Sequence, residues 1–243
     1  MSKFIRTIKS FTSLIGLYRK LNNQFERDDF VIMELKKLNK DSLILDAGSG
    51  SQRYRQHCSH LKYKSQDFAQ YTVDLKKTIA NDVSEQTASY KYGQNDYVGN
   101  IWDINEKDNT FDAILCTEVF EHIPHPIETI KEFSRLLKKD GKLILTAPSN
   151  CLRHFDPFFF YSGFSDRWYE KFLSENGFDI ESITAVGDYY SWLAVEIART
   201  AASHSIFAKL VLTPAFLYFY CKKKTQKSVD TLCMGYHILA KKI

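Results

Sequence analysis

The sequence predicts an α/β fold in which a doubly wound, mostly parallel sheet carries helices on both faces. Apolar runs at residues 43–45, 111–117 and 143–145 are typical of parallel strands, because these are buried on both faces. Residues 126–138 lie between the last two runs, and their apolar side chains recur every three or four positions, as on one face of a helix. This alternation of strands and helices indicates helical crossovers between parallel strands.

The other elements of the first half follow in chain order. A helix is expected at residues 29–39, before the turn Asp41-Ser42, and strands are expected at 63–66 and 97–101. The connection at 68–96 is rich in polar residues and has no clear periodicity. Structureless connections of this length are often functional.

The last third of the chain departs from this alternation. A helix at 165–176, capped by Gly177, precedes a strand near 178–186, and the final strand is expected near 232–240. Two further helices, 189–203 and 205–220, lie between these strands. We expect a helical insertion at about 188–230 that serves as a substrate cap or a partner surface.

Composition and charge limit the class of protein. A chain of 243 residues with 44% hydrophobic residues suits one large globular domain. The five cysteines are widely spaced without a Cys-x-x-Cys pair, which favours neither disulfides nor a cysteine zinc site, so a cytoplasmic location is expected. The apolar segment 206–221 contains Lys209 and Pro214 and is too short for a membrane span.

Basic residues gather at both ends of the chain. Residues 1–25 carry five Lys or Arg and no acid, and their apolar positions predict an amphipathic basic helix. Residues 199–243 carry eight Lys or Arg against Asp230 alone. Peripheral contact with the inner face of a membrane is one interpretation. The alternative is that the apolar stripes cover the domain or pair in a homodimer, so monomer and homodimer both stay open. No nucleic-acid partner is expected.

The sequence LILDAGSGS at residues 43–51 predicts a ligand site. A buried strand ends there in Asp46 and leads into Gly48 and Gly50, where glycine lets the backbone approach a ligand closely. Asp67 lies at the end of the next expected strand, where a carboxylate can accept hydrogen bonds from ribose hydroxyls. Together these features predict a nucleoside site at the switch point of the sheet.

Further segments follow at the spacing of one known family: GNIWDI at 99–104, FDAILCTEVFEHIPHP at 111–126 and LILTAPSN at 143–150. The chain resembles the class I S-adenosylmethionine-dependent methyltransferases, especially type-11-like bacterial members of sugar and polysaccharide biosynthesis. The resemblance implies a Rossmann-like, seven-stranded sheet over residues 26–243, with S-adenosyl-L-methionine as the cofactor.

The resemblance also implies a set of cofactor-binding positions. They are Asp46, Gly48 and Gly50 for the methionine end, Asp67 for the ribose, Asn100 and the backbone of Ile101 for the adenine, and Cys116, Thr117 and Glu118 along the methionine side. The family's third loop glycine is replaced by Gln52, which puts the loop geometry in question.

The expected reaction is O-methylation of a hydroxyl on a sugar, glycan or lipid-linked saccharide, which requires a base for the hydroxyl proton. We favour His154, oriented by Asp156, with His122 as a second candidate. Structural roles for both histidines stay open. An aromatic run from Phe155 to Phe164 is expected to line the acceptor site. The alternatives are a quinone or phenolic-lipid acceptor, or a scaffold that binds cofactor without turnover.

The cluster Glu118, Glu121 and His122 resembles the metal-binding cluster of ubiquinone-pathway O-methyltransferases. The same letters also occur in metal-free relatives, and the sequence reveals no further ligand. We therefore expect no metal.

Overall fold

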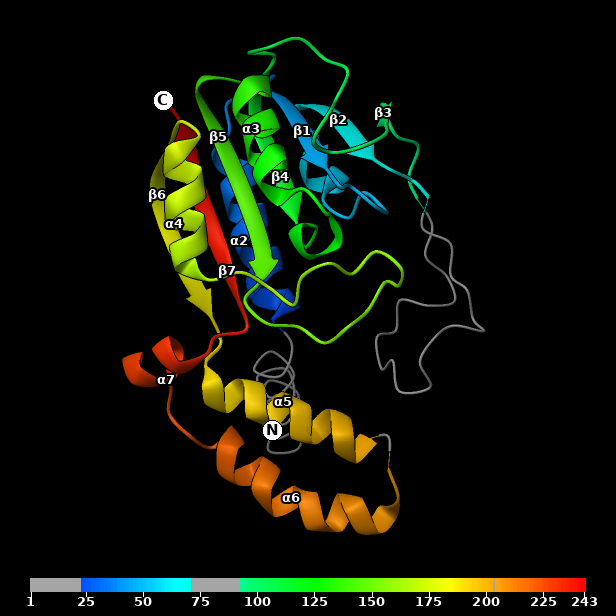
Figure 1. The fold of residues 1–243 in the computed structure, drawn as a ribbon, viewed down its shortest axis with the longest axis vertical. Helices are drawn as coiled ribbons and strands as arrows, with labels where there is room; N and C mark the ends of the chain where they lie inside the picture. Colours follow the sequence, from blue (N-terminus) through cyan, green and yellow to red (C-terminus); the bar gives the residue numbers. More distant parts are fainter. Residues whose placement is uncertain (1–22, 71–91, 203) are drawn as a thin grey trace, which may run out of the picture. The chain divides into compact units, whose positions relative to one another are not determined.

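The computed structural model describes residues 23–70, 92–202 and 204–243 (Figure 1). The chain forms two compact units. One comprises Phe30–Thr184 and Gly235–Ile243, and the other includes Ala185–Met234. The expected helix at 1–25 lies outside the described residues except at its end, as does most of the connection at 68–96.

A seven-stranded sheet forms the larger unit, in the order β3-β2-β1-β4-β5-β7-β6. The strands are β1 (Leu43–Ala47), β2 (Lys62–Asp67), β3 (Tyr97–Val98), β4 (Phe111–Thr117), β5 (Leu137–Pro148), β6 (Phe178–Val186) and β7 (Gly235–Lys242). The pairs from β3 through β5 are parallel, and β7 pairs antiparallel with β5. The predicted doubly wound, mostly parallel sheet is confirmed.

Helices cover both faces of this sheet (Figure 1). They are α2 (Gln24–Lys37), α3 (Pro126–Leu136) and α4 (Asp166–Glu175), with short 3-10 helices η1 (Arg55–His57) and η2 (Phe120–His122). Alternate strand residues point to opposite faces: Leu45 packs in one core cluster with Phe133 of α3, whereas Ile44 packs in the other with Leu35 of α2. This explains why the strands are apolar throughout.

Two strand boundaries differ from the sequence prediction. β3 ends at Val98 rather than at residue 101. The hydrogen bond from the Gly99 N–H to the Asp67 carbonyl is the last of the β2–β3 pairing, and the chain turns away at Gly99, which has a φ of +149°. β5 begins at Leu137, because residues before the expected start at 143 also pair with β4, across a register shift between Phe111 and Ala113.

The order of the strands defines a switch point. From β1 the chain proceeds to β2 and β3 on one side and then returns to β4 on the other side of β1. Open α/β sheets bind ligands at the carboxyl ends of the strands where this reversal occurs. The glycine loop that follows β1 lies at this place.

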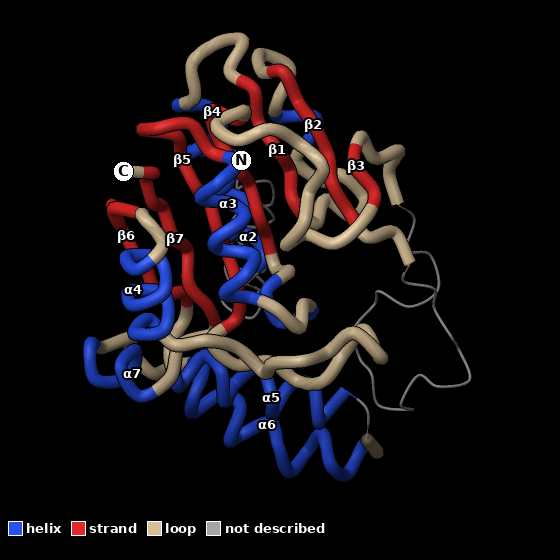
Figure 2. Tube along the Cα trace, turned by 45° about the horizontal axis from the view of Figure 1, so that its top comes forward, coloured by secondary structure: helices blue, strands red, loops and turns tan. Residues whose placement is uncertain are grey.

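The second unit contains α5 (Tyr189–Ala202), α6 (Ile206–Tyr220) and α7 (Gln226–Thr231), the last of which the sequence did not predict. Figures 1 and 2 show α5 and α6 side by side. The Asp188 carboxylate accepts hydrogen bonds from the hydroxyls of Ser191 (2.6 Å) and Ser228 (2.7 Å), which connects the start of α5 to α7. Among the helices of the described residues, none combines the length and the hydropathy of a membrane span.

Candidate active site

The glycine loop after β1 is held against the end of β2. The N–H groups of Gly48 and Ser49 both lie 2.9 Å from the Gln66 carbonyl oxygen and donate to it. Gly48 has a φ of +71°, and a Cβ there would lie 2.5 Å from Cγ2 of Val119. Only glycine fits this backbone, which explains the residue that the sequence motif singled out.

Asp67 contacts the same loop directly. Its Oδ2 accepts a hydrogen bond from the Gly50 N–H at 2.8 Å, and its Oδ1 accepts one from Ala69 at 2.9 Å. Burial raises the pKa of this carboxyl, while the N–H donors of Ala69 and Gly50 act in the opposite direction. The two predicted halves of the nucleoside site are therefore adjacent.

Gln52 adopts the left-handed conformation that a third glycine would adopt without strain, with a φ of +58°. Its buried Nε2 donates to the Gln94 carbonyl at 2.7 Å and to Ser65 Oγ at 3.1 Å. The Gly93 N–H donates to the Gly50 carbonyl at 2.9 Å. Gln52 thus ties the segment before β3 to the loop, a contact that sequence reasoning missed because that segment has no periodic pattern.

Asp46 lies beneath the loop at the end of β1. Its carboxylate is buried and accepts a hydrogen bond from the Tyr63 hydroxyl at 2.6 Å. Burial, reinforced by the negative charge of Asp67, raises the pKa of Asp46 to about 7, although the Tyr63 hydrogen bond opposes the shift. Asp46 therefore titrates near neutral pH.

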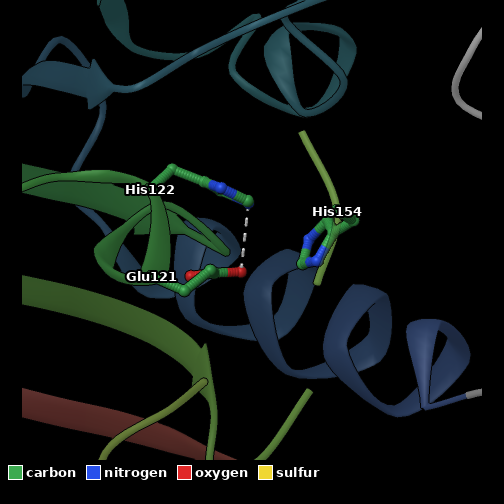
Figure 3. A group of neighbouring side chains, drawn as sticks. All are labelled: Glu121, His122 and His154. Carbon is green, nitrogen blue, oxygen red and sulfur yellow. Dashed lines mark ion pairs between the residues drawn. The ribbon is translucent and has the colours of Figure 1, made fainter. Parts of the chain in front are cut away.

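Two histidines meet beyond the ends of β4 and β5 (Figure 3). The ring centroids of His122 and His154 are 4.6 Å apart, and His122 Nε2 lies 3.5 Å from Glu121 Oε1. His122 Nδ1 lies 2.7 Å from the Phe158 carbonyl oxygen, and His154 Nδ1 lies 2.7 Å from that of Leu152. Because a carbonyl oxygen only accepts, both Nδ1 atoms carry the proton and both Nε2 atoms keep a lone pair when the rings are neutral.

Burial lowers the pKa of His122 to about 4, and the charge of His154 acts in the same direction. His122 is therefore a neutral imidazole at pH 7. Its Nε2 lone pair faces a carboxylate oxygen, an arrangement that a proton or a cation between the two atoms would stabilise.

The loop that carries His154 is fixed to η2. The Glu121 carbonyl accepts from the N–H groups of Phe160 (2.9 Å) and Tyr161 (3.2 Å). The Phe158 ring packs edge-on against Phe68, the residue after Asp67, with centroids 4.8 Å apart. This contact connects the histidine pair to the end of β2, where the predicted nucleoside site lies.

The aromatic run divides into groups. Phe155 and Phe159 contact the histidine rings. Phe164 is buried in the core against Trp168 of α4, and Phe160 is largely exposed. Only part of the run therefore surrounds the histidines.

Comparison with known proteins identifies one domain of the chain. The model of the family described as "Methyltransferase domain" matches residues 45–145, from β1 through β5, a range that includes the glycine loop, Asp67 and His122. The geranyl diphosphate C-methyltransferase of Streptomyces coelicolor, solved with Mg²⁺, geranyl diphosphate and S-adenosyl-L-homocysteine, shares the fold, with a TM-score of 0.52 and 15% identity over 90% of this chain and 79% of that one. Residues 45–145 therefore form a methyltransferase domain.

Curated relatives of this methyltransferase domain match over shorter ranges. An uncharacterised protein of Methanocaldococcus jannaschii is 29% identical over 134 residues, which is 53% of this chain and 52% of that protein. The ubiquinone biosynthesis O-methyltransferase of Xanthomonas oryzae is 46% identical over 41 residues, 17% of either chain. The chain thus spans about half the length of the first of these relatives and less of the second.

The remaining predicted cofactor-binding residues of the methyltransferase domain differ in how exposed their side chains are. Asn100 is exposed directly after Gly99, whereas the Ile101 side chain lies in the core, so only its backbone is presented. The Cys116 thiol is fully buried in the same cluster, so its side chain faces the core, and its place along the methionine side stays a prediction. Thr117 and Glu118 are partly exposed at the end of β4.

The expectation that Asp156 orients His154 is wrong. Asp156 Oδ1 instead accepts hydrogen bonds from Arg153 Nε (2.9 Å) and a second guanidinium nitrogen of that residue (2.7 Å). The Leu152 carbonyl orients His154. The physical reason is that the loop turns at Phe155, which has a φ of +57°, so residues 154 and 156 are directed to different partners.

The group of possible metal ligands differs in one member from the expected cluster of Glu118, Glu121 and His122. Glu118 Oε1 accepts a hydrogen bond from the Thr146 hydroxyl at 2.9 Å. Glu121, His122 and His154 instead form a group in which one donor atom from each residue lies within 4.8 Å of the other two. His154 is the additional donor that the sequence did not reveal, because it comes from a separate loop.

Proposed function

We propose that this chain transfers a methyl group from S-adenosylmethionine to a hydroxyl oxygen. The observation that carries the proposal is the hydrogen bond between Gly50 and Asp67 at the switch point of a methyltransferase domain, with two imidazoles at the ends of the neighbouring strands. Asp67 binds the ribose hydroxyls of the cofactor. Gly48 and Gly50 let its methionine end approach the backbone, and Asn100 accepts from the adenine amino group.

The reaction needs alignment and removal of one proton. The acceptor oxygen attacks the methyl carbon in line, the new C–O bond forms as the C–S bond breaks, and S-adenosylhomocysteine leaves. The acceptor proton passes to His154 Nε2, whose lone pair is made available by the hydrogen bond from Nδ1 to Leu152. Holding the two reactants at near-attack distance supplies about 7 to 11 kcal/mol of barrier reduction in intramolecular models.

The first candidate acceptor is a hydroxyl of a sugar, glycan or lipid-linked saccharide. Phe155 and Phe159 beside the histidines support it, because sugar rings present apolar faces between polar edges. The second candidate is a phenolic or quinol hydroxyl, which the ubiquinone biosynthesis relatives favour. Aromatic side chains suit both acceptors, so their presence does not separate them.

A divalent cation is a second candidate for activating the acceptor. Glu121, His122 and His154 fit such an ion, because both imidazoles donate Nδ1–H to backbone carbonyls, as metal-binding histidines commonly do. Two imidazoles and one carboxylate suit Zn²⁺ or a similar transition metal. When bound, the ion would lower the pKa of the acceptor hydroxyl. The histidines would then hold the ion rather than take the proton.

The test separates binding from turnover. Titration of the purified protein with S-adenosylhomocysteine in a thermal shift assay is expected to raise Tm, since a ligand at 100 times its Kd stabilises the native state by about 2.7 kcal/mol. Labelled donor is then incubated with nucleotide-sugar, glycan and phenolic acceptors, with and without EDTA. The absence of any shift would refute the cofactor assignment. A shift without transfer to any acceptor would indicate a binding scaffold.

A further inference from the structure

The outer face of α6 is apolar and exposed. Its residues recur at helical spacing along one side and are between 51% and 75% exposed. They are Ile206, Phe207, Leu210, Val211, Leu217 and Tyr218. No residue of α6 is buried. Contiguous exposed apolar stripes of this kind are typical of interaction sites, whereas an ordinary solvent-facing helix is mostly polar on its outer face.

The inner face of α6 is already used within the same unit. The side chains that are less exposed, including Leu212 and Phe216, recur on the opposite side, and Phe219 stacks on Tyr190 of α5 with centroids 6.4 Å apart. A capping box between Thr225 and Ser228 begins α7, and the Asp188 hydrogen bonds connect α7 to the start of α5. The exposed stripe therefore belongs to an ordered hairpin with its own interior.

Charge indicates what binds the stripe. Residues 204–227 contain five lysines and no Asp or Glu, and three of these lysines, Lys222–Lys224, directly follow α6. Lys222 Nζ lies 4.4 Å from the centre of the Tyr218 ring, so the basic group borders the apolar face. An apolar face edged by lysine and tyrosine matches the boundary between acyl chains and anionic headgroups.

Other occupants match less well. Residues 1–25 carry five basic residues and no acid, so electrostatic repulsion would oppose their packing beside Lys222–Lys224. A second copy packed parallel on this face would bring the same lysines together. The helix is also too short to cross a bilayer, because 15 residues span about 22 Å against a hydrocarbon core of about 30 Å.

We propose that the outer face of α6 docks in the plane of an anionic lipid surface, with Lys222–Lys224 at the headgroups. The docking is independent of the methyl-transfer reaction proposed above. It predicts binding that falls with ionic strength and that needs both the apolar face and the lysines.

The experiment is co-sedimentation of the full chain with phosphatidylcholine vesicles, with and without phosphatidylglycerol. We expect binding to the anionic vesicles, with at least a tenfold weaker partition constant for L210Q/L217Q and for K222Q/K223Q/K224Q. The matched controls are Val98→Gln, another exposed apolar position, and K36Q/K131Q/K139Q, which removes three exposed lysines elsewhere; both should bind like the wild type. Circular dichroism and Tm verify that each variant is folded.

Three outcomes would overturn the proposal. Wild-type protein that stays in the supernatant with anionic vesicles would exclude lipid docking. Equal binding by the wild type and the α6 variants would assign it to another part of the chain. A wild-type dimer that L210Q/L217Q converts to a monomer, without lipid binding, would assign the face to a second copy.

Discussion

The Gly50 N–H donates a hydrogen bond to Asp67 Oδ2 at 2.8 Å, which joins the loop after β1 to the end of β2. These two residues come from neighbouring parallel strands whose carboxyl ends meet at one edge of the sheet. The same carboxylate is proposed to bind the cofactor ribose. Its contacts thus connect loop geometry to cofactor affinity.

Replacement of Asp67 by alanine should reduce affinity for S-adenosylhomocysteine at least tenfold, because the ribose loses its acceptor and the Gly50 N–H loses its partner. Isothermal titration calorimetry measures the change. Asp179→Ala removes an exposed carboxylate from β6 and should leave Kd unchanged. An unaltered Kd for Asp67→Ala would remove this residue from the cofactor site.

Gly48→Ala should destabilise the protein by about 1 to 3 kcal/mol, because the new Cβ meets Val119 and the backbone φ of +71° disfavours alanine. The double variant with Val119→Ala removes the clash and should recover part of that loss. Urea denaturation of the two single variants and the double variant gives the coupling free energy. Strictly additive effects would contradict the close approach of these two residues.

Asp46 should make stability fall as pH rises. Its pKa is about 7 in the folded protein against an ordinary 3.8, so the folded state holds the proton more tightly than the unfolded chain. The resulting stability is present below about pH 4 and is lost as pH rises to about 7, by about 3 to 5 kcal/mol relative to Asp46→Asn. Asparagine keeps an oxygen for the Tyr63 hydroxyl. Unfolding free energies of the wild type and the variant at several pH values should diverge; parallel curves would show that Asp46 does not titrate in this range.

Loss of the imidazole in His154→Ala should slow methyl transfer by about a hundred- to ten-thousandfold and leave the Kd for S-adenosylhomocysteine unchanged, because the ring is proposed to act on the acceptor proton. Single-turnover assays with labelled donor measure the rate. The exposed His204 provides a matched control substitution that should have no effect. Wild-type rates for His154→Ala at all pH values would eliminate the assigned base.

Glu121→Gln distinguishes a base from a metal centre. If a cation is held by this carboxylate with His122 and His154, the variant should lose binding of Zn²⁺ measured by calorimetry, and EDTA should inhibit the wild type. If the histidines work without metal, neither protein binds Zn²⁺ and EDTA has no effect. Glu118→Gln is the matched control, because that side chain is directed to Thr146.

Local pattern was sufficient to predict the sheet and the adjacency of the glycine loop and Asp67. Continuous apolar runs identified the parallel strands, because burial on both faces leaves no alternation to obscure them. The glycine spacing after β1 and the acid at the end of β2 could be recognised as one site, because parallel topology brings consecutive strand ends to one edge.

The arrangement of the two histidines depends on loops, which have no such periodicity. The sequence named His122 and His154 but did not establish that they meet, and it assigned Asp156 a contact that Arg153 takes instead. It also left the direction of the Cys116 side chain undetermined, because a strand buried on both faces presents every residue to some core.

What the sequence by itself determined was the α/β alternation, the glycine loop and the carboxylate at position 67, all fixed by local periodicity and backbone stereochemistry. What only the tertiary structure decided was the group formed by Glu121, His122 and His154, the burial of Cys116 and the exposure of one face of α6. Each of these depends on packing between segments that are distant along the chain. A hydrogen bond to a backbone carbonyl, such as that of His122 to Phe158, cannot be predicted from the sequence because every residue carries a carbonyl group.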